Sequence, residues 1–174
     1  DVYKRQVYNY ATASANSKLE VYFLQLVDGK MVSTAINVAG MPTTDNTWVS
    51  LTADLSAQAG KTGFVGFKYT STSSSEALSY RLDNIKAGPA EGGDDPDPSG
   101  ETVVVTKDQS YEETFASAFG KFTIDNKELG GLEAVWTIDA SYKCAIASAF
   151  KDAAGIVAES WLVSPIIDMT SILS

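Results

Sequence analysis

The sequence predicts an all-β protein, a sandwich or barrel of short strands. Apolar residues make up 44% of the 174 residues and charged residues 20%, which is the balance of a soluble globular domain. Segments rich in Val, Thr and aromatic residues alternate apolar and polar side chains with the two-residue period of a strand. Turn signals separate these segments at short intervals, and only short helical pieces fit between them.

The first half of the chain contains five predicted strands. They span residues 19–26, 31–38, 48–52, 61–70 and 78–87. Asp28-Gly29 predicts the turn of a hairpin between the first two, and residues 54–60 predict one helical turn closed by glycine. In the fourth strand, Val65, Phe67 and Tyr69 are expected on one face. In the fifth, we expect Tyr80, Leu82 and Asn84 on one face and Arg81, Asp83 and Ile85 on the other.

A linker is predicted at residues 89–101, which contain Pro, Gly and acidic residues but no large apolar side chain. Such a composition favours an extended, solvated tether, and a surface loop within one domain is the alternative. Residues 1–6 resemble a spurious prefix of a metagenomic gene prediction and are expected to lie outside the fold. The chain is expected to be a fragment.

The second half repeats the strand pattern. Its predicted strands span residues 102–106, 111–115, 135–138, 144–150 and 161–165. Turns are expected at Ile124–Lys127, at Gly130-Gly131 and at Asp139–Ser141. Residues 152–160 are expected to form an irregular loop or a short helix, and Pro165 suits the end of a strand.

Composition excludes several classes of function. The chain has no histidine and a single cysteine, Cys144, so it has no Ser-His-Asp triad, no His-ligated zinc site and no intrachain disulfide. Cys144 stands in an apolar stretch and is expected to be a buried structural thiol. A net charge of −9 disfavours nucleic acid and anionic lipid as partners, and no segment approaches the length of a membrane-spanning helix.

Several strings resemble the choice-of-anchor J module, which is related to the cleaved adhesin and MAM-like jelly rolls of bacterial surface proteins. The strings are FTIDNKELGGL at 122–132, ASAF at 147–150, ESWLVSPIID at 159–168, DLSAQAGK at 54–61, GFKYTS at 66–71 and LDNI at 82–85. The resemblance implies a jelly-roll sandwich of the galactose-binding-like kind. It covers most of the chain outside the prefix and the linker.

The order of these strings is reversed relative to the module. Residues 7–88 are similar to its closing half and residues 102–174 to its opening half. A tandem protein cut twice explains this order, and a circular permutant is the alternative. We expect the two halves to pair into one sandwich, because each alone leaves half a core exposed.

Two sets of candidate site residues follow. Trp48, beside the polar turn containing Asp45 and Asn46, is the candidate for stacking against a sugar. Trp161, which is followed by the apolar Leu162 and Val163, is expected in the core. The resemblance implies a structural calcium between first and last strands, at Glu113 and Asp83. Ordinary surface carboxylates are the alternative there. Other acidic residues show no spacing that forces a catalytic pair together.

The expected function is therefore non-catalytic. The resemblance implies an adhesion or binding module of an exported bacterial protein, at the cell surface or secreted. Its expected partners are a glycan or an extracellular protein, together with neighbouring modules of the same chain. The alternatives are a structural spacer without ligand and an accessory domain of a secreted hydrolase or peptidase.

Overall fold

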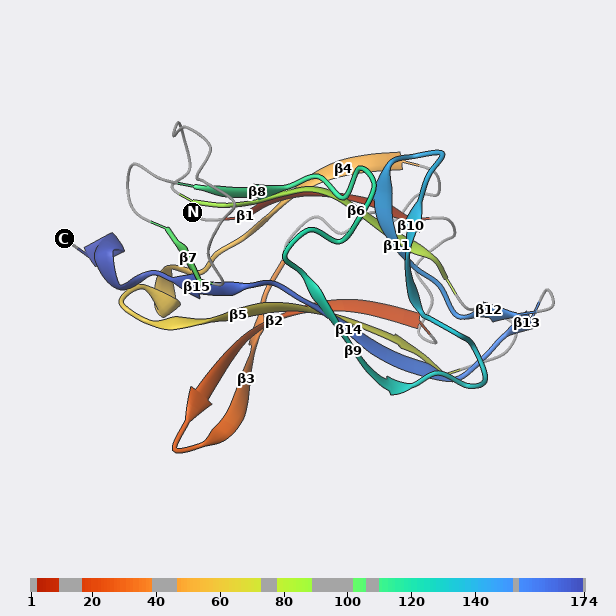
Figure 1. Ribbon diagram of the computed structural model, residues 1–174, viewed down its shortest axis with the longest axis horizontal. Helices are drawn as coiled ribbons and strands as arrows, with labels where there is room; N and C mark the ends of the chain where they lie inside the picture. Colours follow the sequence, from red (N-terminus) through yellow and green to blue (C-terminus); the bar gives the residue numbers. More distant parts are fainter. Residues whose placement is uncertain are drawn as a thin grey trace.

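The chain folds as two antiparallel β-sheets packed face to face, which confirms the predicted all-β sandwich (Figure 1). The computed structural model describes residues 3–9, 17–38, 47–72, 78–88, 102–105, 110–151 and 154–173. Within these ranges the only helical segments are the 3₁₀ turns η1 (Ser56–Gln58) and η2 (Thr170–Leu173). No helix in them has the length and apolarity needed to cross a membrane.

Sheet A is the upper layer in Figure 1. Its strands are β1 (Tyr3–Asn9), β4 (Thr47–Ala53), β6 (Tyr80–Ala87), β8 (Tyr111–Glu113), β10 (Trp136–Asp139) and β11 (Cys144–Ala147). They run in the order β10-β11-β6-β1-β4, and β8 pairs with β6 beside β11.

Sheet B is the lower layer. Its strands are β2 (Ser17–Val27), β3 (Lys30–Ile36), β5 (Thr62–Ser71), β7 (Thr102–Val104), β9 (Thr123–Glu128), β14 (Ala158–Val163) and β15 (Ile166–Asp168). Their order is β3-β2-β5-β14-β9, and β15 joins β5 to β7. A small ribbon, β12 (Phe150–Lys151) with β13 (Ala154–Gly155), lies at one end of the molecule.

One apolar core fills the space between the sheets. Val65, Phe67 and Tyr69 are buried on the inner face of β5, as the alternation predicts. The largest fully buried side chains also include Trp136 of β10 and Phe115, which follows β8. Their burial excludes water from the space between the two sheets and supplies the main driving force for the fold.

Both halves of the chain contribute to each sheet. In sheet A, β6 pairs with β8 and β11; in sheet B, β5 pairs with β14 and β15. The expected pairing of the halves into one sandwich is therefore confirmed. The assignment of the sandwich as a jelly roll and the boundaries of native modules stay predictions, and residues 89–101 lie outside the described part.

The secondary structure of three segments differs from the expectation. Tyr3–Gln6 do not lie outside the fold, because they belong to β1 between β4 and β6. Ile124–Lys127 form part of strand β9 rather than a turn, since β14 supplies a hydrogen-bonding partner to this polar segment. The described part of 152–160 is strand rather than helix, with β13 and the start of β14.

The alternation expected along β6 breaks after Asp83. Gln6 pairs with Asp83 and Lys4 with Lys86, so β6 has one residue more than β1 across this step, which is a β-bulge. Asn84 occupies it with φ of 50°. Leu82 and Ile85 both face the core as a result, while Asn84 is exposed. This corrects the expectation that Leu82 and Asn84 share one face and that Ile85 lies on the other.

Candidate functional site

The outer face of sheet B, which points away from the core, carries a pair of partly exposed aromatic rings. Tyr22 of β2 and Trp161 of β14 lie on opposite sides of β5, with ring centroids 5.1 Å apart. Their strand neighbours point inward: Val21 and Leu162 are buried in the core. Tyr22, Gly66, Lys68, Glu159 and Trp161 are called the aromatic platform below.

Gly66 allows the two rings to meet above β5. It pairs with Tyr22 across one edge of the strand, and Trp161 pairs with the next outward residue, Lys68. A Cβ atom at position 66 would lie 3.0 Å from the Trp161 ring and 3.0 Å from the Leu24 side chain. A residue without a Cβ atom at this position therefore permits the close packing of these side chains.

Two charged side chains lie beside the Trp161 ring. Lys68 Nζ lies 5.4 Å from the Trp161 ring centroid and 3.0 Å from Glu159 Oε2. The indole Nε1–H donates to Glu159 Oε1 at 3.4 Å. The ion pair and the cation–π contact hold both charges beside an aromatic face while leaving each side chain partly accessible.

The expectation that Trp161 belongs to the core is wrong. In β14 the buried positions are Ala158, Ser160 and Leu162, and Trp161 alternates with them on the outer side. The tryptophan that fills the core is Trp136, whose Nε1–H donates to the Ser160 carbonyl at 3.4 Å. Apolar neighbours in sequence misled the prediction, because in a strand the immediate neighbours lie on the opposite face.

Trp48, the candidate chosen from the sequence, lies on the outer face of sheet A. It is partly exposed, while Val49 and Leu51 beside it pack inward. Asp45 and Asn46 fall outside the described residues. The β4–β1–β6 register places Trp48 and Arg81 in one row, each opposite Tyr8 of β1.

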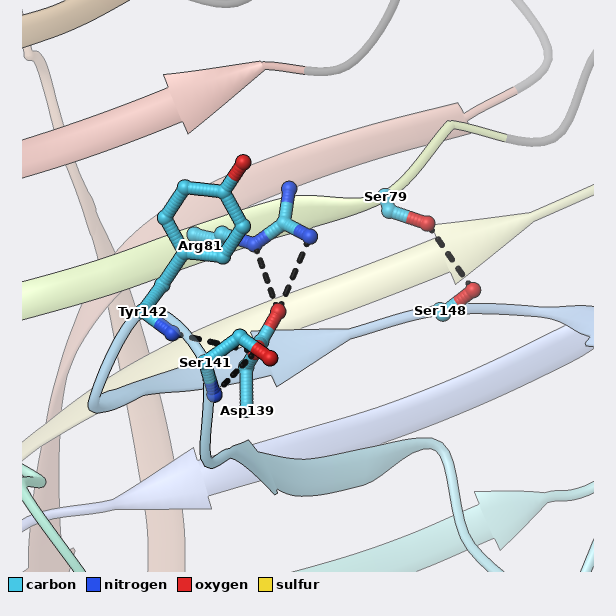
Figure 2. A network of polar contacts seen from close by, with 6 residues as sticks. All are labelled: Ser79, Arg81, Asp139, Ser141, Tyr142 and Ser148. Carbon is cyan, nitrogen blue, oxygen red and sulfur yellow. Dashed lines mark hydrogen bonds and ion pairs between the residues drawn. The ribbon is translucent and has the colours of Figure 1, made fainter.

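Figure 2 shows the polar cluster around Arg81 on this face. Arg81 donates from Nε to Asp139 Oδ2 at 3.0 Å, and its Nη2 lies 2.9 Å from the same oxygen. The Asp139 Oδ1 atom accepts the backbone N–H groups of Ser141 and Tyr142. The ring of Tyr142 lies over the guanidinium, 4.5 Å from its central carbon, so the cluster fixes the β10–β11 turn.

Glu113 and Asp83, the pair expected to bind calcium, lie on neighbouring strands. Glu113 of β8 is opposite Ile85 of β6, two residues from Asp83. Its carboxylate accepts the Tyr111 hydroxyl and the N–H groups of Thr114 and Phe115, so it orders the loop after β8. Burial and the negative charge of Glu112 raise the pKa of Asp83.

The described residues contain no group of three or more acidic, cysteine or histidine side chains able to hold a metal. Calcium binding at Glu113 and Asp83 stays a prediction. Cys144 is buried, as expected, and burial raises the pKa of its thiol to about 11. A thiol with so high a pKa is almost entirely protonated at neutral pH, which disfavours a role as nucleophile.

No protein-family model matches the chain, and no curated protein or solved structure matches it either. Among the described residues, the aromatic platform combines two partly accessible rings with an ion pair on one face.

Proposed function

We propose that the chain is a non-catalytic carbohydrate-binding module that holds a glycan on the outer face of sheet B. The observation that carries the proposal is the partly exposed Tyr22–Trp161 ring pair, 5.1 Å between centroids, beside the Lys68–Glu159 ion pair. Sugar rings present C–H groups that pack on aromatic faces and hydroxyls that hydrogen-bond to charged groups. Ligand sites usually combine apolar and aromatic side chains with a few polar groups that orient the ligand.

The platform supports a neutral glycan rather than a sulfated or uronic one. Lys68 is paired with Glu159, and the next pair on this side of the sheet, Lys127 with Asp125, is also balanced at 2.6 Å. A polyanion gains little from such a charge-balanced face, and the chain as a whole carries a net charge of −9. The resemblance to the choice-of-anchor J module supports a place at the bacterial cell surface, where glycans are abundant.

The experiment is a glycan array probed with the labelled chain, followed by titration of the best neutral ligand by calorimetry. Trp161→Ala should weaken binding by at least about tenfold, because a central aromatic contact contributes more than about 1.4 kcal/mol. Trp48→Ala is the matched control, a partly exposed tryptophan on the other sheet, and should bind as the original chain does. Loss of binding in Trp48→Ala alone would place the site on sheet A and refute the proposal.

Gly66→Val tests the platform without removing either ring. The branched side chain displaces the Trp161 ring, so binding should fall as in Trp161→Ala while the core stays intact. Thr70→Val, on the same face of the same strand, is its control. Failure of the original chain to bind any glycan on the array would favour the spacer alternative.

A further inference from the structure

The β2–β3 hairpin extends away from the body of the sandwich (Figure 1). Four apolar side chains near its tip are strongly exposed: Leu26 by 65%, Val27 by 44%, Met31 by 56% and Val32 by 46%. Leu26 is paired with Met31 on one face, while Val27 and Val32 lie on the other. A two-stranded ribbon with apolar groups on both faces is marginal in water, and such a cluster marks an interaction surface.

The outer edge of β3 is also open. Strand β3 ends sheet B, and among the described residues no strand pairs with that edge. It has no proline, no bulge and one charge, Lys30, whereas β9 at the opposite edge carries Asp125, Lys127 and Glu128. Charged side chains are a usual protection of edge strands against pairing. The β9 edge of sheet B is therefore protected against pairing with another strand, whereas the β3 edge is not.

We propose that β3 pairs with β3 of a second copy of this chain, antiparallel about a two-fold axis at Ser33. The turn residues Asp28 and Gly29 have φ of 50° and 75°, a two-residue hairpin turn in which Val27 and Lys30 form the closing hydrogen-bonded pair. Counting from it, Met31, Ser33 and Ala35 direct their backbone N–H and C=O groups away from β2. These groups form the new ladder: Ser33 with Ser33, and Met31 with Ala35 of the second copy.

The β3 edge is a place where charge does not oppose a second copy. The chain carries 22 acidic residues, yet none occurs from Gly29 to Thr44. Two chains of net charge −9 repel each other over most of their surfaces, and β3 is an edge where their approach brings no carboxylates together. The pairing is self-complementary: Val32 meets Thr34 of the second copy, a favourable β-branched pair, and Met31 gains an apolar cover.

The axis of an antiparallel pair is perpendicular to the sheet, so both aromatic platforms would face the same side of a continuous sheet. Only this consequence depends on the proposed glycan binding. Two sites on one side raise the avidity for a repetitive glycan without any new contact.

Sedimentation of the full chain over a concentration series tests the pairing. We expect a species of twice the 18.5 kDa chain mass, reversible on dilution. Ser33→Pro removes an outward N–H while leaving the β2 ladder intact, and should give a monomer; Ser33→Ala keeps the N–H and should dimerise. Val32→Lys sets two like charges diagonally across the axis and should weaken the dimer at least about tenfold.

A chain that stays monomeric at about 1 mM, where an association of about −4 kcal/mol would be visible, overturns the proposal. So does a Ser33→Pro variant that folds and dimerises like the original, or a monomer whose β3 edge binds only an unrelated extended peptide. The two proposals fail separately, because Val32→Lys should retain the single-site glycan affinity whatever its oligomeric state.

Discussion

The ion pair between Arg81 and Asp139 is the most buried pair of opposite charges in the described part of the chain. The two side chains are exposed by 11% and 16%. Desolvation alone would raise the pKa of Asp139, but hydrogen bonds from Arg81, Tyr142 and Ser141 outweigh it and lower that pKa. The ionised carboxylate is therefore stabilised by folding, and the pair stabilises the fold in turn.

Asp139→Asn should lower the free energy of unfolding by about 2 kcal/mol at pH 7, because it leaves a largely buried guanidinium without its carboxylate. The folded pKa of Asp139 lies below the ordinary value of 3.8. The stability that the ionised Asp139 carboxylate contributes to the fold is thus complete above pH 3.8. It is lost as the pH falls through the lower pKa of the folded state. Urea unfolding at pH 7 and at decreasing pH measures both effects.

Asp125→Asn is the control for this prediction. Asp125 and its partner Lys127 are exposed by 53% and 54%, and an ion pair so accessible to water contributes little. If Asp125→Asn lowered the free energy of unfolding as much as Asp139→Asn, the assigned role of the Arg81 pair would be contradicted. The same holds if the effect of Asp139→Asn on that free energy did not diminish in acid.

Single residues also show which parts of the candidate site could not be predicted from the sequence. Trp48 was predictable as a surface tryptophan because polar residues precede it, and it is partly exposed. Trp161 was not, since the face of a strand residue depends on which neighbours the sheet buries rather than on their hydropathy alone. Tyr22 and Trp161 meet because Gly66 lies between them. These three residues belong to strands that are far apart in sequence, and only the pairing of the strands brings them together.

At the scale of elements, β6 shows how one residue redirects a strand. The bulge at Asp83–Asn84 turns Ile85 into the core beside Leu82. Asn84 adopts φ of 50°, and its N–H donates to the Asp83 carboxylate at 2.8 Å. Asn tolerates this left-handed conformation better than other residues that carry a Cβ atom.

Asn84→Val should destabilise the protein by about 1–2 kcal/mol, because a β-branched residue is strained at positive φ. Asn84→Gly should change the stability by less than about 1 kcal/mol, since glycine accepts this φ but makes the unfolded chain more flexible. Thermal unfolding compares the two. Equal effects of both variants would show that the side chain, rather than the backbone conformation, determines stability here.

The strands that the sequence predicted best are those with a strong apolar alternation, above all β2 and β5. The hairpin turn at Asp28-Gly29 was predictable as well, because both residues suit positive φ. Strand β9 was missed because Asp125, Asn126 and Lys127 read as a turn. Pairing with β14 overrides that local preference, and such long-range partners are not visible in a local window.

At the scale of the whole molecule, the two halves are interleaved rather than adjacent. Phe67 of β5 and Leu162 of β14, both fully buried, face each other across the junction between them in sheet B. In sheet A, β6 lies between β1 on one side and β8 and β11 on the other. Neither half can bury its own apolar faces, so the stability of each depends on the other.

Residues 1–88 and 102–174, produced as two separate chains, should therefore reassemble. Each alone should bind a hydrophobic dye and lack cooperative unfolding, because half of the core is exposed to water. Their mixture should recover near-ultraviolet circular dichroism and a cooperative transition. Leu162→Asp in the second chain should abolish reassembly, since it buries a charge in the shared core, whereas Trp161→Ala on the outer face of the same strand should permit it. Cooperative folding of either half alone would instead mark that half as a complete module and would contradict the interdependence of the two sheets.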